Sequence, residues 1–267
     1  MNETDEFQEL VNPSRLKIER AKKHVADLQS CCQTFLQKQP FELWSRVRRG
    51  QYKREIFVKQ QEVIPDDIAL ILGDVVHNLK SALDILAWRM VGDKAPNPKR
   101  VLFPFAETED GLKGSIGNRQ TALAGEKVVK TIKALKPYLG GDEYLYGIQA
   151  LDTSDKHHFI ITTAQVSPIV ANDFRLLGVE NFVGEGIVIF NLPTGQTLIS
   201  QPIAGNRAAR RSLKPFEMKE DHQPTFKICF GPKQGFDVQP VIETSLSMIK
   251  SVENAVQTIG LAYCNKS

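Results

Sequence analysis

Four polar residues recur along a stretch that otherwise has the pattern of a buried helix. Asp74, His77, Ser81 and Asp84 are spaced by three, four and three residues, so they lie on one side of a helix and neighbours in the series can reach one another. A solvent-facing helix side normally carries many long charged chains, and few occur here. We therefore expect another part of the protein to cover this polar stripe.

A second polar cluster occupies residues 151–158, with the sequence LDTSDKHH. If the two segments meet, an aspartate can orient His77 as a general base, and a lysine can stabilise negative charge developing on a phosphate or carboxylate. The predicted catalytic residues are His77, Asp84, Asp155 and His157. The predicted substrate-binding residues are Asn78, Lys80, Ser81 and Lys156.

The same residues also have a purely structural interpretation. A histidine in a contact between helices is commonly a neutral, hydrogen-bonded group, and lysine or histidine near a helix end is favoured by the helix dipole. Two classes of function therefore stay open. One is a small hydrolase or nuclease-like enzyme, and the other is a non-catalytic binding or scaffolding protein whose polar cluster is structural.

The two clusters also contain the nitrogen and oxygen groups that hold zinc, manganese or iron. No metal-binding spacing such as H-E-x-x-H occurs, so the metal stays unknown. The glycine patterns of Walker and dinucleotide-binding loops are missing, as is the G-x-S-x-G of a nucleophile elbow. The sequence therefore identifies no cofactor and argues against Ser81 as a nucleophile.

Composition and charge limit the partners. Hydrophobic residues make up 42% of the chain and charged residues 24%, which is typical of a globular protein, and 34 basic against 31 acidic residues is too small an excess to indicate nucleic acid. Basic stretches at 46–49 and 206–214 keep a nucleic-acid partner open, although no aromatic residues accompany the second for base stacking. A small molecule or a phosphate-containing ligand is the other expectation.

Targeting signals are not apparent. The acidic start lacks the regions of a signal peptide, and no uncharged apolar run approaches the roughly 20 residues that cross a bilayer. We therefore expect no membrane partner, a cytoplasmic location and four reduced cysteines. The sequence leaves homo-oligomer formation unknown.

Helical and strand patterns predict the elements that position the two clusters. We expect helices over 12–40, 66–91 and 126–136, another from about 142, and a last one from Pro240. A mobile loop is expected over 107–124, and a short extended piece at 103–105. The apolar side of the 66–91 helix should be core: Ile68, Leu72, Val75, Leu79, Ala82, Leu83, Leu86 and Met90.

The predicted fold is α+β, with a helical core, a small antiparallel β portion and a closing C-terminal helix. Residues 1–165 are expected to form a mainly helical region with a β-hairpin near 41–60. Residues 166–267 are expected to hold the antiparallel β portion and the C-terminal helix, which packs back on the helical core.

The stretch from Gly73 to Ala87 resembles the motif G-D-x-x-H-N-L-R-S-A-L-D-x-L-A of a family of uncharacterised bacterial proteins. In that family a phenylalanine-proline segment, a proline-tyrosine helix end and D-K-H-R follow, and the similar stretches here are 103–105, 137–138 and 155–158. The resemblance covers about residues 66–160 and brings no established activity. It implies that one group contains His77, Asn78, Ser81, Asp84, Asp155, Lys156 and His157.

This chain departs from that pattern at two positions. Lys80 and His158 stand where the family has arginine, which weakens a forked grip on phosphate. A fainter similarity links the histidine-bearing helix to the helical HEPN ribonucleases. The arginine that those enzymes place four to six residues before the histidine is missing here.

Overall fold

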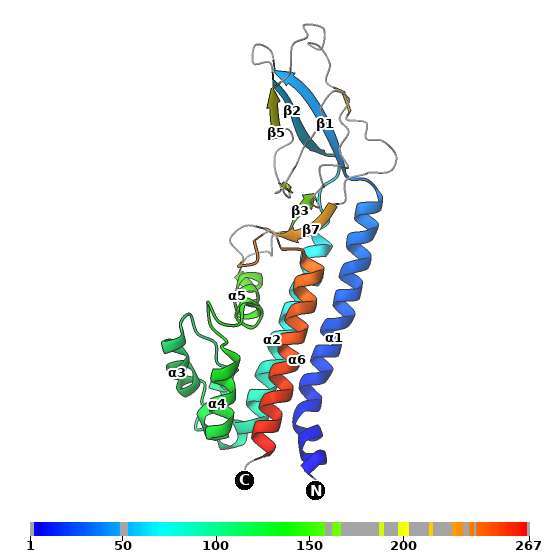
Figure 1. The fold of residues 1–267 in the computed structure, drawn as a ribbon. Coiled ribbons are helices and arrows are strands. Elements are labelled where there is room, and N and C mark those ends of the chain that lie inside the picture. The colour runs from blue at the N-terminus through cyan, green and yellow to red at the C-terminus, as the bar shows by residue number, and fades with distance from the viewer. Residues whose placement is uncertain are drawn as a thin grey trace.

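Three long helices form the body of the protein in the computed structural model. They are α1 (Glu3–Gln37), α2 (Asp66–Val91) and α6 (Val241–Cys264), and they run side by side (Figure 1). The structure describes residues 3–48, 53–157, 162–166, 187–189, 197–202, 214–215, 226–231, 235–237 and 239–265. The start of α1 and the end of α6 lie at the same end of the bundle. The predicted helical core is confirmed.

Helix α2 is central to this core, and its bounds match the predicted ones. The eight residues predicted to form its apolar side are each at most 2% exposed. Both α1 and α6 pack against α2. Because burying each large apolar side chain contributes about 1.5–3 kcal/mol, this packing fixes the rotation of α2. The direction in which its polar stripe points is fixed with it.

Smaller helices lie on one side of the bundle (Figure 1). They are α3 (Glu109–Asn118), α4 (Glu126–Leu135) and α5 (Glu143–His157), with short 3-10 turns η1 (Gly92–Lys94), η2 (Pro98–Arg100) and η3 (Thr121–Ala124). Helix α5 contacts α2, and α4 contacts α6. Because α5 contains residues 151–157, the second polar cluster lies beside α2.

Helix α3 replaces the mobile loop that we expected over 107–124. Thr108 caps its start by accepting a hydrogen bond from the backbone N–H of Gly111, and Leu112 and Ile116 are buried one turn apart. The glycines of this segment obscured the helical pattern. Helix α1 also begins earlier than predicted and runs through Pro13, because Phe7, Leu10 and Val11 already belong to its buried side.

Short strands occur near the other end of the bundle. They are β1 (Phe41–Arg48), β2 (Lys53–Gln60), β3 (Thr162–Val166), β4 (Ile187–Ile189), β5 (Thr197–Pro202), β6 (Lys214–Pro215) and β7 (Phe226–Phe230). Strands β1 and β2 pair antiparallel where the sequence predicts a hairpin, within the order β5-β2-β1-β6. The other order is β4-β3-β7. Most of the predicted antiparallel portion over 166–231 lies outside the described residues.

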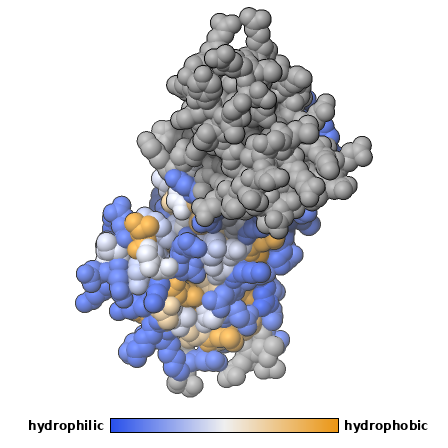
Figure 2. Space-filling model, turned by 45° about the horizontal axis from the view of Figure 1, so that its top comes forward, coloured by the Kyte–Doolittle hydropathy of each residue, from blue (hydrophilic) through white to orange (hydrophobic). Residues whose placement is uncertain are grey.

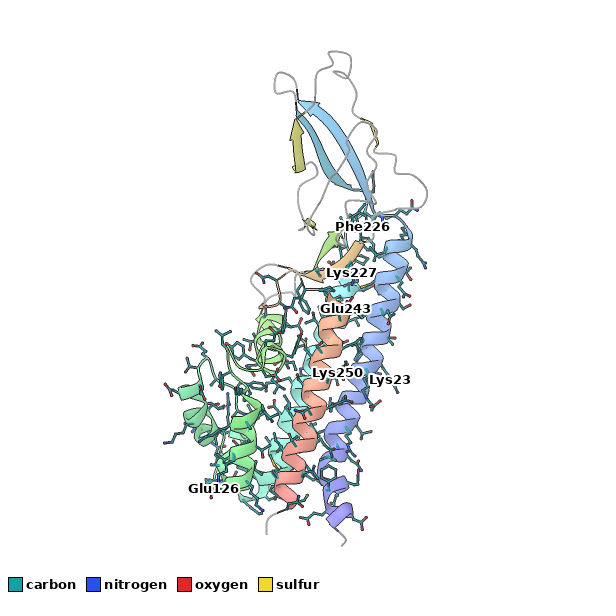
Figure 3. The ribbon with its side chains drawn as sticks, in the orientation of Figure 1. Lys23, Glu126, Phe226, Lys227, Glu243 and Lys250 are labelled. Carbon is teal, nitrogen blue, oxygen red and sulfur yellow. The ribbon has the colours of Figure 1, made fainter. Side chains whose placement is uncertain are left out.

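Two further contacts involve α6 and the segment before it. Lys227 of β7 lies 2.6 Å from Glu243 of α6, and Figure 3 shows these two side chains together. A Cβ at Gly147 of α5 would lie 2.1 Å from the ring of Phe236, which is 1% exposed. Because Gly147 has no side chain, the ring of Phe236 packs directly on α5.

The outer face of the helices is mainly polar. On the face shown in Figure 2, hydrophilic residues surround small apolar areas of the described helices. None of the helices in the described part of the chain is long and apolar enough to span a bilayer.

Candidate functional site

The two predicted polar clusters meet where α5 packs against α2. Nδ1 of His77 lies 3.3 Å from Oδ1 of Asp152, within reach of a hydrogen bond in which Nδ1–H donates to the carboxylate. The side chain of Asp152 is 6% exposed and that of His77 is 55% exposed. A buried carboxylate therefore orients an accessible imidazole. None of the described residues hydrogen-bonds the second ring nitrogen, Nε2.

A glycine allows the helices to approach so closely. A Cβ at Gly73 would lie 2.7 Å from both carboxylate oxygens of Asp155. The carboxylate of Asp155 is thus placed against the backbone of α2, one turn before His77. The predicted convergence of His77 with the 151–158 segment is observed, but the aspartate that contacts the imidazole is Asp152.

Asp84 makes its hydrogen bonds about two turns further along α2 than His77. Its Oδ2 accepts a hydrogen bond from Nζ of Lys80 at 2.6 Å, and its Oδ1 accepts one from the backbone N–H of Phe103 at 2.8 Å. Residues seven apart share a helix side but lie about 10 Å apart along its axis. This placement corrects the expectation that Asp84 serves His77. Its contacts anchor the extended segment that contains Phe103.

The remaining predicted residues are divided between several places. The ammonium of Lys80 lies 5.3 Å from the ring centroid of Phe105, and its side chain is 10% exposed. Asn78 instead faces α1: its amide donates to the carbonyl of Asp74 at 2.8 Å, and its Oδ1 lies 3.5 Å from Nζ of Lys17. Asn78 therefore takes part in the contact between α1 and α2, and its role in substrate binding stays a prediction. Ser81 is half-buried.

Two predicted residues cannot be placed by their side chains. Helix α5 extends to His157, so the backbone of Lys156 and His157 belongs to it. Their side chains lie outside the described residues. The predictions that Lys156 binds substrate and that His157 is catalytic remain predictions.

A groove of about 600 Å³ runs beside this contact. Its walls come from α2, from the segment 102–107 and from α5. Its polar lining consists of Lys80, Asp84, Glu107, Arg119, Tyr146, Gln149, Asp152 and Thr153. Volumes of about 300–1,000 Å³ are typical of sites for small molecules. Asp152 belongs both to the groove and to the contact with His77.

The sequence interpretation missed part of this lining. Asp152 follows Leu145 by seven residues and Ile148 by four, so it lies on the buried side of α5, and a carboxylate in that position was a usable signal. Tyr146, Gln149 and Thr153 also share one helix side. Arg119 follows the end of α3 and had no comparable signal.

The described side chains do not form a metal centre. Within the described part of the chain, no group of three or more histidine, cysteine, aspartate or glutamate side chains is close enough to hold a metal ion. No disulfide joins two cysteines within the described part of the chain. Burial raises the pKa of Cys32 and of Cys229 to about 12, so neither is a nucleophile at neutral pH.

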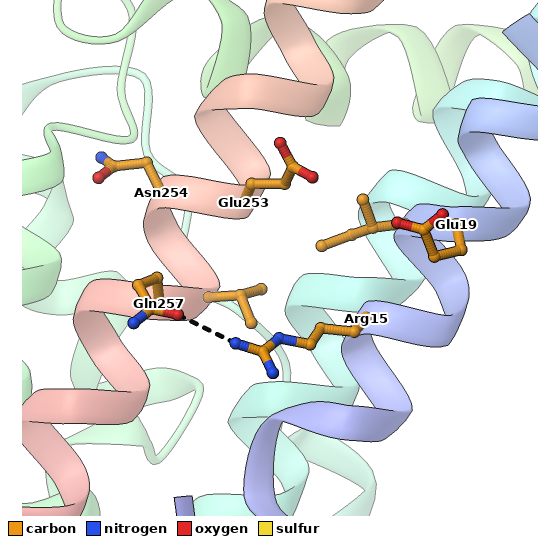
Figure 4. A pocket seen from close by; sticks show the side chains of 7 residues that line it. Arg15, Glu19, Glu253, Asn254 and Gln257 are labelled. Atoms are coloured by element: carbon orange, nitrogen blue, oxygen red, sulfur yellow. Dashed lines mark hydrogen bonds between the residues drawn. The ribbon is translucent and has the colours of Figure 1, made fainter. Parts of the chain in front are cut away.

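A second hollow, of about 530 Å³, lies between α1 and α6. Figure 4 shows Arg15 of α1 reaching Gln257 of α6, with an N–O distance of 3.1 Å. Glu19 and Glu253, which also line it, both contact Lys22 at 2.7 and 2.8 Å. Its charged groups are therefore used to join the two helices.

Comparisons with known proteins add no information about the site. No protein-family model matches the chain, and no curated protein or solved structure shows significant similarity to it.

Proposed function

We propose that the groove beside α2 and α5 is the substrate site of a small hydrolase in which His77 and Asp152 act as a general-base pair. The observation that carries this proposal is the double role of Asp152. Its buried carboxylate lines the groove and also contacts His77, so a single carboxylate links the imidazole to a space large enough for a small molecule.

The chemistry follows from the two ring nitrogens. Asp152 accepts a hydrogen bond from Nδ1–H and so favours the tautomer with a lone pair on Nε2. Nε2 then takes a proton from water, whose oxygen forms a bond to the ester carbon or phosphorus. The bond to the leaving-group oxygen breaks, and the imidazolium gives its proton to that oxygen, which leaves as the alcohol. General-base catalysis of this type contributes about 10²–10⁴-fold in rate.

We also propose a small antiparallel β portion in 166–267 and a cytoplasmic location. We propose that the chain belongs to the family of uncharacterised bacterial proteins whose motif residues 73–87 resemble. The ligand expected is a small or phosphate-containing molecule. Nucleic acid is a weaker alternative, since the basic stretch at 206–213 lies outside the described residues.

A scaffolding role is the second candidate, and a specific contact favours it. Lys80 and Asp84 form a mostly buried pair, and Asp84 also receives the backbone N–H of Phe103. These groups join α2 to the neighbouring segment without exposing a reactive atom. If His77 and Asp152 did only the same, the polar stripe would have no catalytic role.

Hydrolysis of p-nitrophenyl acetate and p-nitrophenyl phosphate tests the proposal. We expect hydrolysis above the buffer rate, falling about 100-fold or more in His77→Ala and Asp152→Asn. Asp74→Asn is the matched control, because Asp74 lies on the same stripe, is exposed and does not line the groove. Equal rates in all four proteins, or no hydrolysis by the unmodified protein, would overturn the proposal.

A further inference from the structure

A third hollow lies directly beside the groove. It has a volume of about 680 Å³ and is bordered by η2, α3 and the segment 105–108. We call it the α3 hollow. Four residues line both the groove and the α3 hollow: Phe105, Ala106, Glu107 and Arg119. The two spaces are therefore separated only by a ridge, residues 105–107.

The α3 hollow differs from the groove in charge. Its charged lining consists of Arg100, Arg119 and Glu107, so the arginines outnumber the carboxylate. Within the described residues neither arginine side chain forms an ion pair, and both are exposed. In the groove, by contrast, the ammonium of Lys80 is already bound by Asp84, and the remaining cation is Arg119, which also lines the α3 hollow. The cationic groups available to an anion are thus those of the α3 hollow.

The ridge between the two spaces is held on both sides. The Oγ of Ser115 donates a hydrogen bond to the carbonyl of Phe105 at 2.7 Å, and the backbone N–H of Ala106 donates to the carbonyl of Pro137 at 3.2 Å. Phe103, just before the ridge, is bound by Asp84. A ligand that crosses the ridge therefore meets a wall that is already ordered, which reduces the entropy lost on binding.

We propose that the substrate is a small phosphorylated molecule whose phosphate is bound in the α3 hollow by Arg100 and Arg119. Guanidinium groups bind phosphate through paired, charge-assisted hydrogen bonds. The rest of the molecule crosses the ridge and lies in the groove, against Phe105 and Tyr146. The inference rests on the proposed function for the reaction at His77, whereas binding of the phosphate requires only the two arginines.

Calorimetric titration with inorganic phosphate tests the α3 hollow directly. We expect binding by the unmodified protein, weakened about tenfold or more in Arg100→Ala and in Arg119→Ala. Lys113→Ala is the matched control, because Lys113 is an exposed cation of α3 that does not line the hollow. Thermal melts of the arginine variants should be unchanged, since both side chains are exposed.

The outcomes separate this inference from the proposed function. His77→Ala should bind phosphate like the unmodified protein, and arginine-dependent binding without any hydrolysis would leave the phosphate site standing while removing the hydrolase. The opposite result is also informative. If hydrolysis of p-nitrophenyl acetate depends on His77 but phosphate does not bind at millimolar concentrations, the phosphate site in the α3 hollow is overturned and the hydrolase stands. Equal weakening in Lys113→Ala would also overturn the phosphate site, because only general charge would then be involved.

Discussion

Two contacts of the same helix stripe differ in what they leave accessible. Lys80 and Asp84 are both mostly buried, and each oxygen of Asp84 has a donor. One turn earlier on α2, His77 is more than half exposed, although its partner Asp152 is more deeply buried than either Lys80 or Asp84. Lys80 and Asp84 are four residues apart on α2, whereas His77 reaches across to α5. The difference in exposure indicates that the first contact stabilises the fold and that the second can also meet a ligand.

The largest expected effect is the removal of Asp84. Asp84→Ala leaves the buried ammonium of Lys80 and the N–H of Phe103 without their acceptor, which should destabilise the protein by about 2–4 kcal/mol. Urea unfolding measures this loss. Adding Lys80→Met removes the stranded charge, so the double variant should be more stable than Asp84→Ala alone. A loss below about 1 kcal/mol would remove the structural role.

Asp152→Asn should have the next largest effect on stability. The amide keeps the shape of the buried group but loses a charge-assisted hydrogen bond, which should lower the free energy of unfolding by about 1.5–3 kcal/mol. Combining it with His77→Ala in a double-mutant cycle measures the coupling of the two side chains. Additive losses would show that the contact with His77 contributes nothing to stability.

His77→Ala separates the two contacts most clearly. Because the imidazole is 55% exposed, we expect a loss of stability of only about 0.5–1 kcal/mol, together with the loss of hydrolysis described above. Thermal melts and rate measurements on the same samples give both values. A loss as large as that of Asp84→Ala, with rates unchanged, would place His77 among the structural residues.

The smallest effect is expected at an exposed pair with the same N–O distance as Lys80 and Asp84. Lys227 and Glu243 are also 2.6 Å apart, but their side chains are 47% and 55% exposed. Glu243→Gln should therefore change stability by only about 0.2–0.5 kcal/mol. Burial alone would raise the pKa of Glu243, but hydrogen bonds from Lys227 and from its own backbone outweigh burial and lower it.

The sign of the pH dependence follows from that lowered pKa. The contribution of Glu243 is fully present above the ordinary pKa of 4.5 and is lost as the pH falls through the folded-state value. The unmodified protein and Glu243→Gln should differ in urea midpoint at pH 7 and converge below pH 4.5. A difference that grew on acidification would contradict this assignment.

Helical periodicity predicted the elements better than the partners within the site. The bounds of α2 and its eight core residues could be predicted because burial repeats with the helical period. That His77 meets Asp152, and that Asp84 meets Phe103, depends on how α5 and the 103–105 segment pack on α2. One sequence contains no direct signal of such distances. The helix α3 was missed because its glycines hide an apolar pattern of only Leu112 and Ile116.

All the residues that line the groove come from the first part of the chain, up to Thr153. Yet α5, which supplies several of them, fits against the ring of Phe236 through Gly147 and also packs on α6, and both partners follow it by more than 75 residues in the sequence. A nascent chain of which only the first 160 residues have left the ribosome therefore lacks Phe236, against which α5 packs. We expect the site to mature only after Phe236 has been synthesised, which would keep shorter nascent chains from binding ligand.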